Sequence, residues 1–141
     1  MDTQLKQIMT EKVETVGPGS TLQETANKMK NRNVGVIPVV DGKKVIGIIT
    51  DRDITLRAVA PGLDVTKTKV SDLMTREPTF AYEDQTMYEA CQLMEKNKVR
   101  RLIVLNRDGS LAGVVSLNDV TIKGKEPERS AQVLIRITPA A

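Results

Sequence analysis

Two turns in this chain place a hydroxyl side chain three residues before a carboxylate. The first turn, in the string GIITDRD, has Thr50 and Asp53. The second, in the string GVVSLND, has Ser116 and Asp119. A hydroxyl can donate a hydrogen bond to a phosphate oxygen, and a carboxylate can accept hydrogen bonds from the two hydroxyls of a ribose. The spacing therefore indicates a nucleotide, with phosphate and sugar on opposite sides of each turn.

The same residue pairs also fit an interpretation that needs no ligand. A hydroxyl followed three residues later by an acid is an acidic variant of the capping box, which satisfies backbone N–H groups at the start of a helix. A single copy favours capping. Two copies, each with a matching glycine at Gly47 and Gly113 and each between an apolar run and a helical pattern, require a further explanation.

The two turns belong to a longer internal repeat. The second string begins at position 113 and the first at 47, an offset of 66. Ile8-Met9-Thr10 matches Leu73-Met74-Thr75 at an offset of 65, and the runs Val34–Val40 and Val99–Leu105 also match. The offset grows by one at the turn before the second string, where a loop can absorb an insertion.

Each half predicts the order strand, helix, strand, hairpin strand, helix. A half of roughly 60 residues would bury only a marginal core, so we expect the two halves to share one. The segment Val133–Thr138 is apolar and β-branched and has no counterpart in the first half. It is compatible with an added edge strand, an arm that pairs with a partner, or a disordered tail.

The doubled turn, with its matching strands, resembles a tandem pair of CBS domains, known together as a Bateman module. The resemblance covers about residues 5–123. It implies a first repeat at 5–60, a linker at 61–69, a second repeat at 70–123 and a tail at 124–141 with a possible extra strand. The implied fold is α+β: two pseudo-twofold related β-α-β-β-α repeats packed through their sheets.

The resemblance also implies a ligand and a set of contacts. Many relatives bind AMP, ADP, ATP, S-adenosylmethionine or a related adenosine compound between the repeats. By position, the residues expected at phosphate and ribose are Thr50, Asp53, Ser116 and Asp119. The residues expected beside the base are Val13, Thr15 and Thr79. A basic pair, Arg100 and Arg101, falls where many relatives carry a basic pair that reaches a phosphate across the cleft.

The two halves differ at the positions of that basic pair. The first repeat has Gly35-Val36 where the second has Arg100-Arg101. Asp51 adds a carboxylate beside Asp53, and carboxylates disfavour a polyphosphate unless a cation compensates. We expect one good site, completed by the basic pair, and one that is weaker or empty.

Composition narrows the function classes further. The chain has 141 residues, a formal net charge of +3, no histidine and one cysteine, Cys91. The absence of histidine excludes histidine-based triads, zinc sites with histidine ligands and histidine general bases. The sequence also has no Walker loop, no metal-ligand cluster and no setting that would activate the cysteine. We therefore expect no enzymatic activity, and an enzyme is the least supported of three hypotheses. An aromatic content of 2% argues against nucleic-acid stacking. A lone cysteine, no long apolar run and no signal-peptide pattern favour a cytoplasmic protein without a membrane segment.

The sequence thus predicts a small-molecule sensor rather than a catalyst. An adenosine nucleotide would be its regulatory ligand, with no required cofactor. The resemblance implies a homodimer, and the chain could act on an unidentified regulated protein. The alternative is an assembly module, in which the paired turns only cap helices and the protein forms a dimer or docks on a partner without any ligand.

Overall fold

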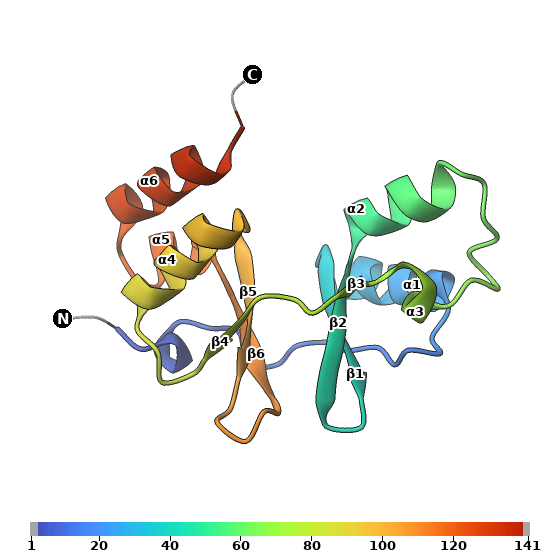
Figure 1. Ribbon diagram of the computed structural model, residues 1–141, viewed down its shortest axis with the longest axis horizontal. Helices are drawn as coiled ribbons and strands as arrows, with labels where there is room; N and C mark the ends of the chain where they lie inside the picture. Colours follow the sequence, from blue (N-terminus) through green and yellow to red (C-terminus); the bar gives the residue numbers. More distant parts are fainter. Residues whose placement is uncertain (1–2, 140–141) are drawn as a thin grey trace. The chain divides into compact units, whose positions relative to one another are not determined.

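A computed structural model of the chain describes residues 3–139, which divide into two compact units. Residues 13–78 form the first-repeat unit. Residues 3–12 and 79–139 form the second-repeat unit. Each unit has one three-stranded sheet and its own helices (Figure 1), as the predicted α+β class requires.

The first-repeat unit is built on an antiparallel sheet in the order β1-β2-β3. The opening strand expected near Val13–Val16 is reduced to one parallel bridge, between Val16 and Val39. Beyond β2 the chain forms one continuous helical stretch, whose second part, η2, is a π-helix. The elements are α1 (Leu22–Arg32), β1 (Val36–Asp41), β2 (Lys44–Thr50), α2 (Asp51–Ile54), η2 (Thr55–Val59), α3 (Val70–Leu73) and β3 (Thr75–Arg76).

The second-repeat unit has the sheet order β4-β5-β6. Strand β4 runs parallel to β5, and β5 is antiparallel to β6. The elements are η1 (Leu5–Gln7), β4 (Phe80–Tyr82), α4 (Met87–Asn97), β5 (Arg101–Leu105), β6 (Leu111–Ser116), α5 (Leu117–Ile122) and α6 (Pro127–Ile137).

The long helix of each unit begins and ends in the same way. At the start of α1, the Thr21 hydroxyl accepts a hydrogen bond from the Glu24 N–H, at 3.1 Å. The helix ends at Asn33 in the left-handed conformation, with φ 53°. In α4 the corresponding cap is Thr86, and the left-handed end is Lys98. Matching caps fix where both helices start and stop, so the repeat extends to the backbone.

The opening segments of the two repeats are exchanged between the units. Thr10 pairs with Val114 on β6 through two backbone hydrogen bonds, although Thr10 belongs to the first repeat. Thr75, from the second repeat, pairs with Ile48 on β2. Gly47 permits this close approach, because a Cβ there would lie 2.9 Å from the Thr75 carbonyl oxygen. The compact units therefore cross the boundaries of the sequence repeats.

The buried apolar side chains of the described residues form two clusters, each inside one unit. A core shared between the two halves stays a prediction. The exchanged segments explain how each half obtains enough apolar surface: Leu5 and Ile8 enter the core of the second-repeat unit. Val70 and Met74 enter the core of the first-repeat unit.

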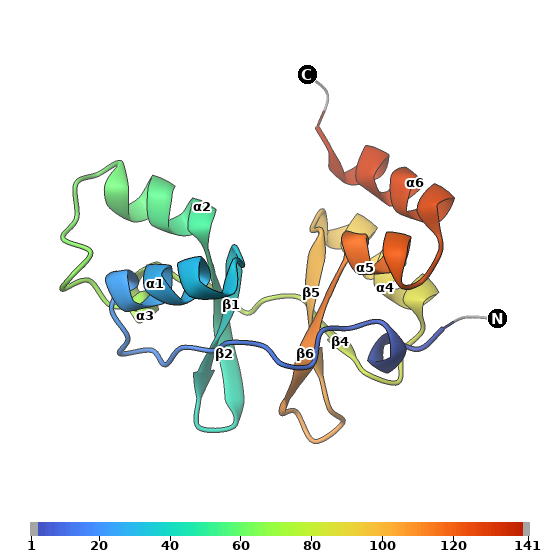
Figure 2. The ribbon, with the colours of Figure 1, turned by 180° about the vertical axis from the view of Figure 1, so that it is seen from behind.

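The C-terminal segment is a helix, not the possible extra strand. Helix α6 lies against α4 and α5 (Figure 1 and Figure 2). Its buried residues, Ser130, Val133 and Ile137, recur at helical spacing, and Pro127 occupies a position at the helix start where its missing N–H costs nothing. This periodicity of three and four outweighs the β-branched composition, because burying one apolar face stabilises the helix.

Candidate functional site

In the first-repeat unit, Thr50 ends β2 and is the N-cap of α2. The Asp53 N–H donates to Thr50 Oγ1 at 3.0 Å, and the Thr50 N–H donates to Asp53 Oδ2 at 3.0 Å. Arg57 Nε lies 3.9 Å from Asp53 Oδ1. The Asp53 side chain is 14% exposed, so the carboxylate is held in place near the surface.

The second-repeat unit has the same turn between β6 and α5. The Ser116 N–H donates to Asp119 Oδ2 at 2.9 Å, and the Asp119 N–H donates to Ser116 Oγ at 3.3 Å. Lys123 Nζ lies 3.4 Å from Asp119 Oδ1. Lys123 follows Asp119 by four residues, as Arg57 follows Asp53, so even the flanking cation is duplicated.

The capping interpretation is therefore confirmed at both turns. It does not exclude a ligand. In each carboxylate, Oδ2 bonds the cap and Oδ1 faces a half-exposed cation of the next turn. A carboxylate oxygen has two lone pairs, and an exposed ion pair contributes little stability. A ribose hydroxyl could therefore bond Oδ1 while the cap stays intact.

The sheet of the second-repeat unit brings three predicted site residues to one end. Arg101, at the start of β5, pairs with Ser116 at the end of β6. Thr79 directly precedes β4, which runs parallel to β5 with Phe80 opposite Ile103. The starts of two parallel strands and the end of their antiparallel neighbour lie at the same end of the sheet. Thr79 and Arg101 thus lie at the end of the sheet where the Ser116 turn begins.

Arg100, the other member of the basic pair, lies directly beside the turn. Its carbonyl oxygen accepts a hydrogen bond from the Leu117 N–H at 3.0 Å. Both Arg100 and Arg101 are exposed. Arg101 is the first residue of β5, and Arg100 is a bend residue directly before it.

The first-repeat unit has the equivalent arrangement. Val36, at the start of β1, pairs with Thr50 at the end of β2. Val13 and Thr15 precede the parallel bridge at Val16, and so lie toward the same end of the sheet. The Thr15 carbonyl oxygen already accepts a hydrogen bond from Lys28 Nζ, at 2.8 Å.

The main difference between the two turns is what stands in the place of Arg100. In the first-repeat unit this position is Gly35, whose carbonyl oxygen accepts from the Asp51 N–H at 2.9 Å. A Cβ built on Gly35 would lie 2.8 Å from Asp51 Oδ2. The carboxylate of Asp51 therefore packs against the α carbon of Gly35.

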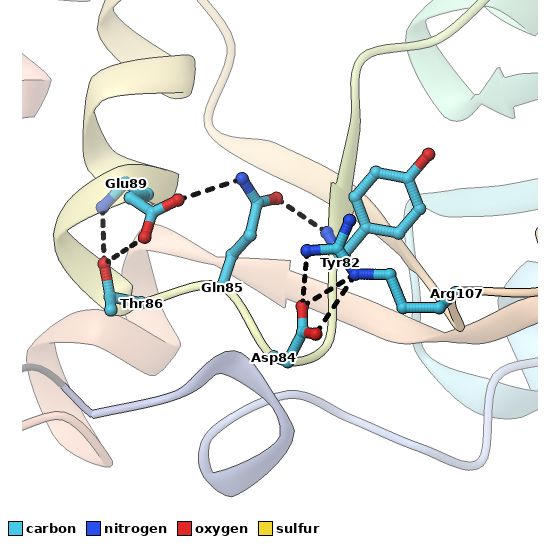
Figure 3. Close-up of polar contacts among 6 residues, drawn as sticks. All are labelled: Tyr82, Asp84, Gln85, Thr86, Glu89 and Arg107. Atoms are coloured by element: carbon cyan, nitrogen blue, oxygen red, sulfur yellow. Dashed lines mark hydrogen bonds and ion pairs between the residues drawn. The ribbon is translucent and has the colours of Figure 1, made fainter.

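The sequence did not reveal a polar network in the second-repeat unit (Figure 3). Arg107, in the β5–β6 turn, donates to both Asp84 oxygens at 2.9–3.1 Å and stacks over the Tyr82 ring, 4.3 Å from its centre. This hydrogen bonding lowers the pKa of Asp84 and raises the pKa of Arg107. No local pattern signals a contact between residues 23 positions apart.

The Asp84 side of this network continues to the start of α4. Gln85 accepts from the Tyr82 N–H at 2.8 Å and donates to Glu89 at 3.1 Å, while the Thr86 hydroxyl also donates to Glu89, at 3.2 Å (Figure 3). These bonds link strand β4 to the start of helix α4.

Two other site classes find no support among residues 3–139. No group of three or more histidine, cysteine, aspartate or glutamate side chains is arranged to hold a metal ion. Within the same residues, every helix is too short or too polar to cross a bilayer.

Comparisons with known proteins match the repeats. The CBS domain family model matches residues 5–59 and 70–123. The chain is 38% identical over 134 residues to the CBS domain-containing protein YhcV of Bacillus subtilis, covering 95% of this chain and 94% of the relative. It is also 35% identical over 136 residues to an inosine-5'-monophosphate dehydrogenase of Methanocaldococcus jannaschii, but spans only 26% of that enzyme.

Solved structures agree with the fold. The CBS domain pair of protein MJ0100, in complex with 5'-methylthioadenosine and S-adenosyl-L-methionine, has a TM-score of 0.75 and 27% identity, covering 84% of this chain and 97% of that one. Hypoxic Response Protein I, with two coordinated zinc ions, has a TM-score of 0.76 and 29% identity, with coverages of 84% and 97%. With both repeats matched by the family model and a relative aligned over nearly its full length, the chain belongs to the CBS domain family, as a tandem pair of CBS domains.

Proposed function

We propose that this CBS domain pair is a non-catalytic regulatory module that binds an adenosine compound of the class of AMP, ADP, ATP or S-adenosylmethionine. The observation that carries the proposal is the duplicated turn, in which the Oδ1 atom of a nearly buried carboxylate lies just beyond the end of a strand. The adenosine compounds bound to the MJ0100 pair support the ligand class.

Each turn has a proposed set of contacts within its own unit. Asp53 and Asp119 accept from ribose hydroxyls, and Thr50 and Ser116 lie beside the sugar and the group joined to its 5' carbon. Val13 and Thr15 in the first-repeat unit, and Thr79 in the second, contact the base. Arg100 and Arg101 supply positive charge for a phosphate at the Ser116 turn.

Regulation requires that the ligand change an equilibrium with a partner, and we propose a homodimer as one form of that partner. Leu56 and Ile122 occupy equivalent places, each three residues after the site carboxylate, and are 50% and 74% exposed. We propose that these two exposed apolar side chains form part of the contact with a second copy of the chain. A regulated protein in the cytoplasm is the further partner we propose.

A second candidate is a ligand-independent assembly module. It is favoured by the completed capping boxes, which satisfy the helix starts with no ligand present. This candidate predicts a stable dimer or partner complex whose stability does not respond to any adenosine compound.

Thermal unfolding of the nucleotide-stripped protein against AMP, ADP, ATP, S-adenosylmethionine and NAD separates the two candidates. A ligand at about 100 times its Kd should stabilise the protein by roughly 2.7 kcal/mol, a shift of several degrees in Tm. The sensor predicts a shift that Asp53→Asn or Asp119→Asn removes. Asparagine keeps an oxygen for the cap, so these variants remove the charge with little disturbance of the helix start. The matched control is Asp41→Asn, at the other end of the β1–β2 hairpin. No shift with any ligand would favour the assembly module.

A further inference from the structure

We infer that the two turns select different adenosine ligands: the first-repeat turn takes adenosine compounds that carry no phosphate, and the second-repeat turn takes a 5'-phosphate. This inference rests on the proposed function and deepens it. It replaces the expectation of one good and one weak site with two sites of different specificity.

The Asp51 carboxylate lies against Gly35, the position that Arg100 has in the second-repeat unit. The backbone hydrogen bonds Asp51 to Gly35 and Leu117 to Arg100 show that these pairs are equivalent. Asp51 Oδ2 occupies the space that a side chain on Gly35 would enter. The first-repeat turn therefore has a negative charge next to Gly35, the position that the basic residue Arg100 has in the second-repeat unit.

The balance of charged residues also differs between the two turns. Arg57 is engaged twice in the first-repeat unit, since its Nε faces Asp53 and its Nη1 donates to the Leu73 carbonyl oxygen at 3.1 Å. With Arg52, which is exposed, this turn has two cations and two carboxylates.

In the second-repeat unit the residue equivalent to Asp51 is Leu117, which is buried and uncharged. Asp119 is the one carboxylate of the turn sequence, against the cations Arg100, Arg101 and Lys123. A surplus of positive charge favours a phosphate, whereas a balanced turn with a carboxylate at the phosphate side does not.

The chemistry of the first ligand class follows. A neutral thioether or a cationic sulfonium at the 5' carbon of adenosine meets no repulsion from Asp51, and a sulfonium is attracted to it. A phosphate at the same carbon would face a like charge at close range. An unscreened charge pair near a protein surface is strong enough to change an affinity roughly tenfold.

The test is calorimetric titration of the stripped full chain with AMP and with 5'-methylthioadenosine. Asp53→Asn should weaken the binding of 5'-methylthioadenosine and leave the affinity for AMP unchanged. Asp119→Asn should weaken the binding of AMP and leave the affinity for 5'-methylthioadenosine unchanged. In the Asp119→Asn background, adding Asp51→Asn should raise the affinity for AMP about tenfold by creating a phosphate-tolerant first-repeat turn. Adding Asp41→Asn instead, a charge change of the same kind at the far end of the hairpin, should leave it unchanged.

The outcomes separate the two levels of the proposal. If both ligands bind the wild-type protein but Asp53→Asn and Asp119→Asn weaken them equally, or if Asp51→Asn does not improve AMP binding, the selectivity is wrong while the sensor function stands. If neither AMP nor 5'-methylthioadenosine binds the wild-type protein, the selectivity is wrong, and the proposed function is wrong as well if ADP, ATP and S-adenosylmethionine also fail to bind.

Discussion

The first-repeat and second-repeat turns have similar capped backbone arrangements but differ in the charged residues around them. In both, a strand ends at a hydroxyl residue that caps the next helix, and an aspartate three residues later closes the box. The residue after the hydroxyl differs, Asp51 against Leu117, and so does the residue that bonds it, Gly35 against Arg100. The comparison teaches that the cap fixes the geometry of the turn, and that the flanking residues are the ones available to choose the ligand.

The helices that follow the two turns also differ. In the first-repeat unit α2 continues into the π-helix η2, where the Ala60 N–H donates to the Thr55 carbonyl oxygen at 2.9 Å. In the second-repeat unit α5 ends after Ile122, and α6 packs on it. The Thr121 and Ser130 hydroxyls hydrogen bond between α5 and α6. The helix after the second-repeat turn is thus hydrogen bonded to α6, an added helix that the first-repeat unit does not have.

The largest effect is expected where the exchanged segment crosses β6. A side chain at Gly113 would collide with the Thr10 carbonyl oxygen and approach Met9 Sδ at 3.1 Å. Gly113→Val should destabilise the protein by about 3 kcal/mol, because backbone must shift. Urea unfolding measures this. Gly47→Val should have a similar effect through Thr75, whereas Gly19→Ala, with open space around it, should not. A Gly113→Val midpoint equal to that of the wild type would show that Thr10 does not dock on β6.

Removal of the buried side chain of α6 should have the next largest effect. Val133 is 1% exposed, and Val133→Ala should cost about 2 kcal/mol in unfolding free energy through lost burial and a small cavity. Ile135, 74% exposed on the same helix, is the control, and Ile135→Ala should change stability by less than about 0.5 kcal/mol. Equal effects of the two substitutions would contradict the packing of α6 on α4 and α5.

The caps should contribute equally in the two units. Thr50→Ala and Ser116→Ala each remove the hydroxyl that accepts a backbone N–H, and each should cost about 1 kcal/mol. Denaturant midpoints of the two variants and their double mutant measure this. A cost at only one turn would show that the turns differ in scaffold as well as in charge.

The smallest effect concerns pH and is confined to the second-repeat unit. The Arg107 hydrogen bonds lower the pKa of Asp84 in the folded protein below its ordinary value of 3.8. A carboxylate with a lowered folded pKa adds stability above its unfolded pKa and loses that contribution as the pH falls through the folded value. Because the pair is exposed, the contribution is small.

Asp84→Asn should therefore be slightly less stable than the wild type at pH 6, with the difference shrinking below about pH 4. Thermal unfolding of the variant and the wild type at pH 6 and at pH 3 measures this stability difference. Gly19 stands in the place of Asp84 in the first repeat, so no equivalent pair exists there. A stability difference that does not change between pH 6 and pH 3 would mean that the Asp84 charge does not contribute.

The sequence was informative wherever the determinants are local. The α+β class, the family and the two capped turns follow from short-range patterns such as Thr50-x-x-Asp53 and its copy. The exchange of Thr10 and Thr75 between units could not be predicted, because each segment matches its own repeat in sequence and docks on the other. The helical state of Val133–Ile137 was hidden by β-branched composition, since the deciding factor is the surface of α4 and α5.

The most direct test of the account is the binding stoichiometry of the stripped wild-type protein with AMP and 5'-methylthioadenosine together. The account predicts one equivalent of each per chain, bound at the same time, with saturation by one ligand leaving about one equivalent of the other still to bind. Complete competition between the two ligands, or no binding of either, would contradict it.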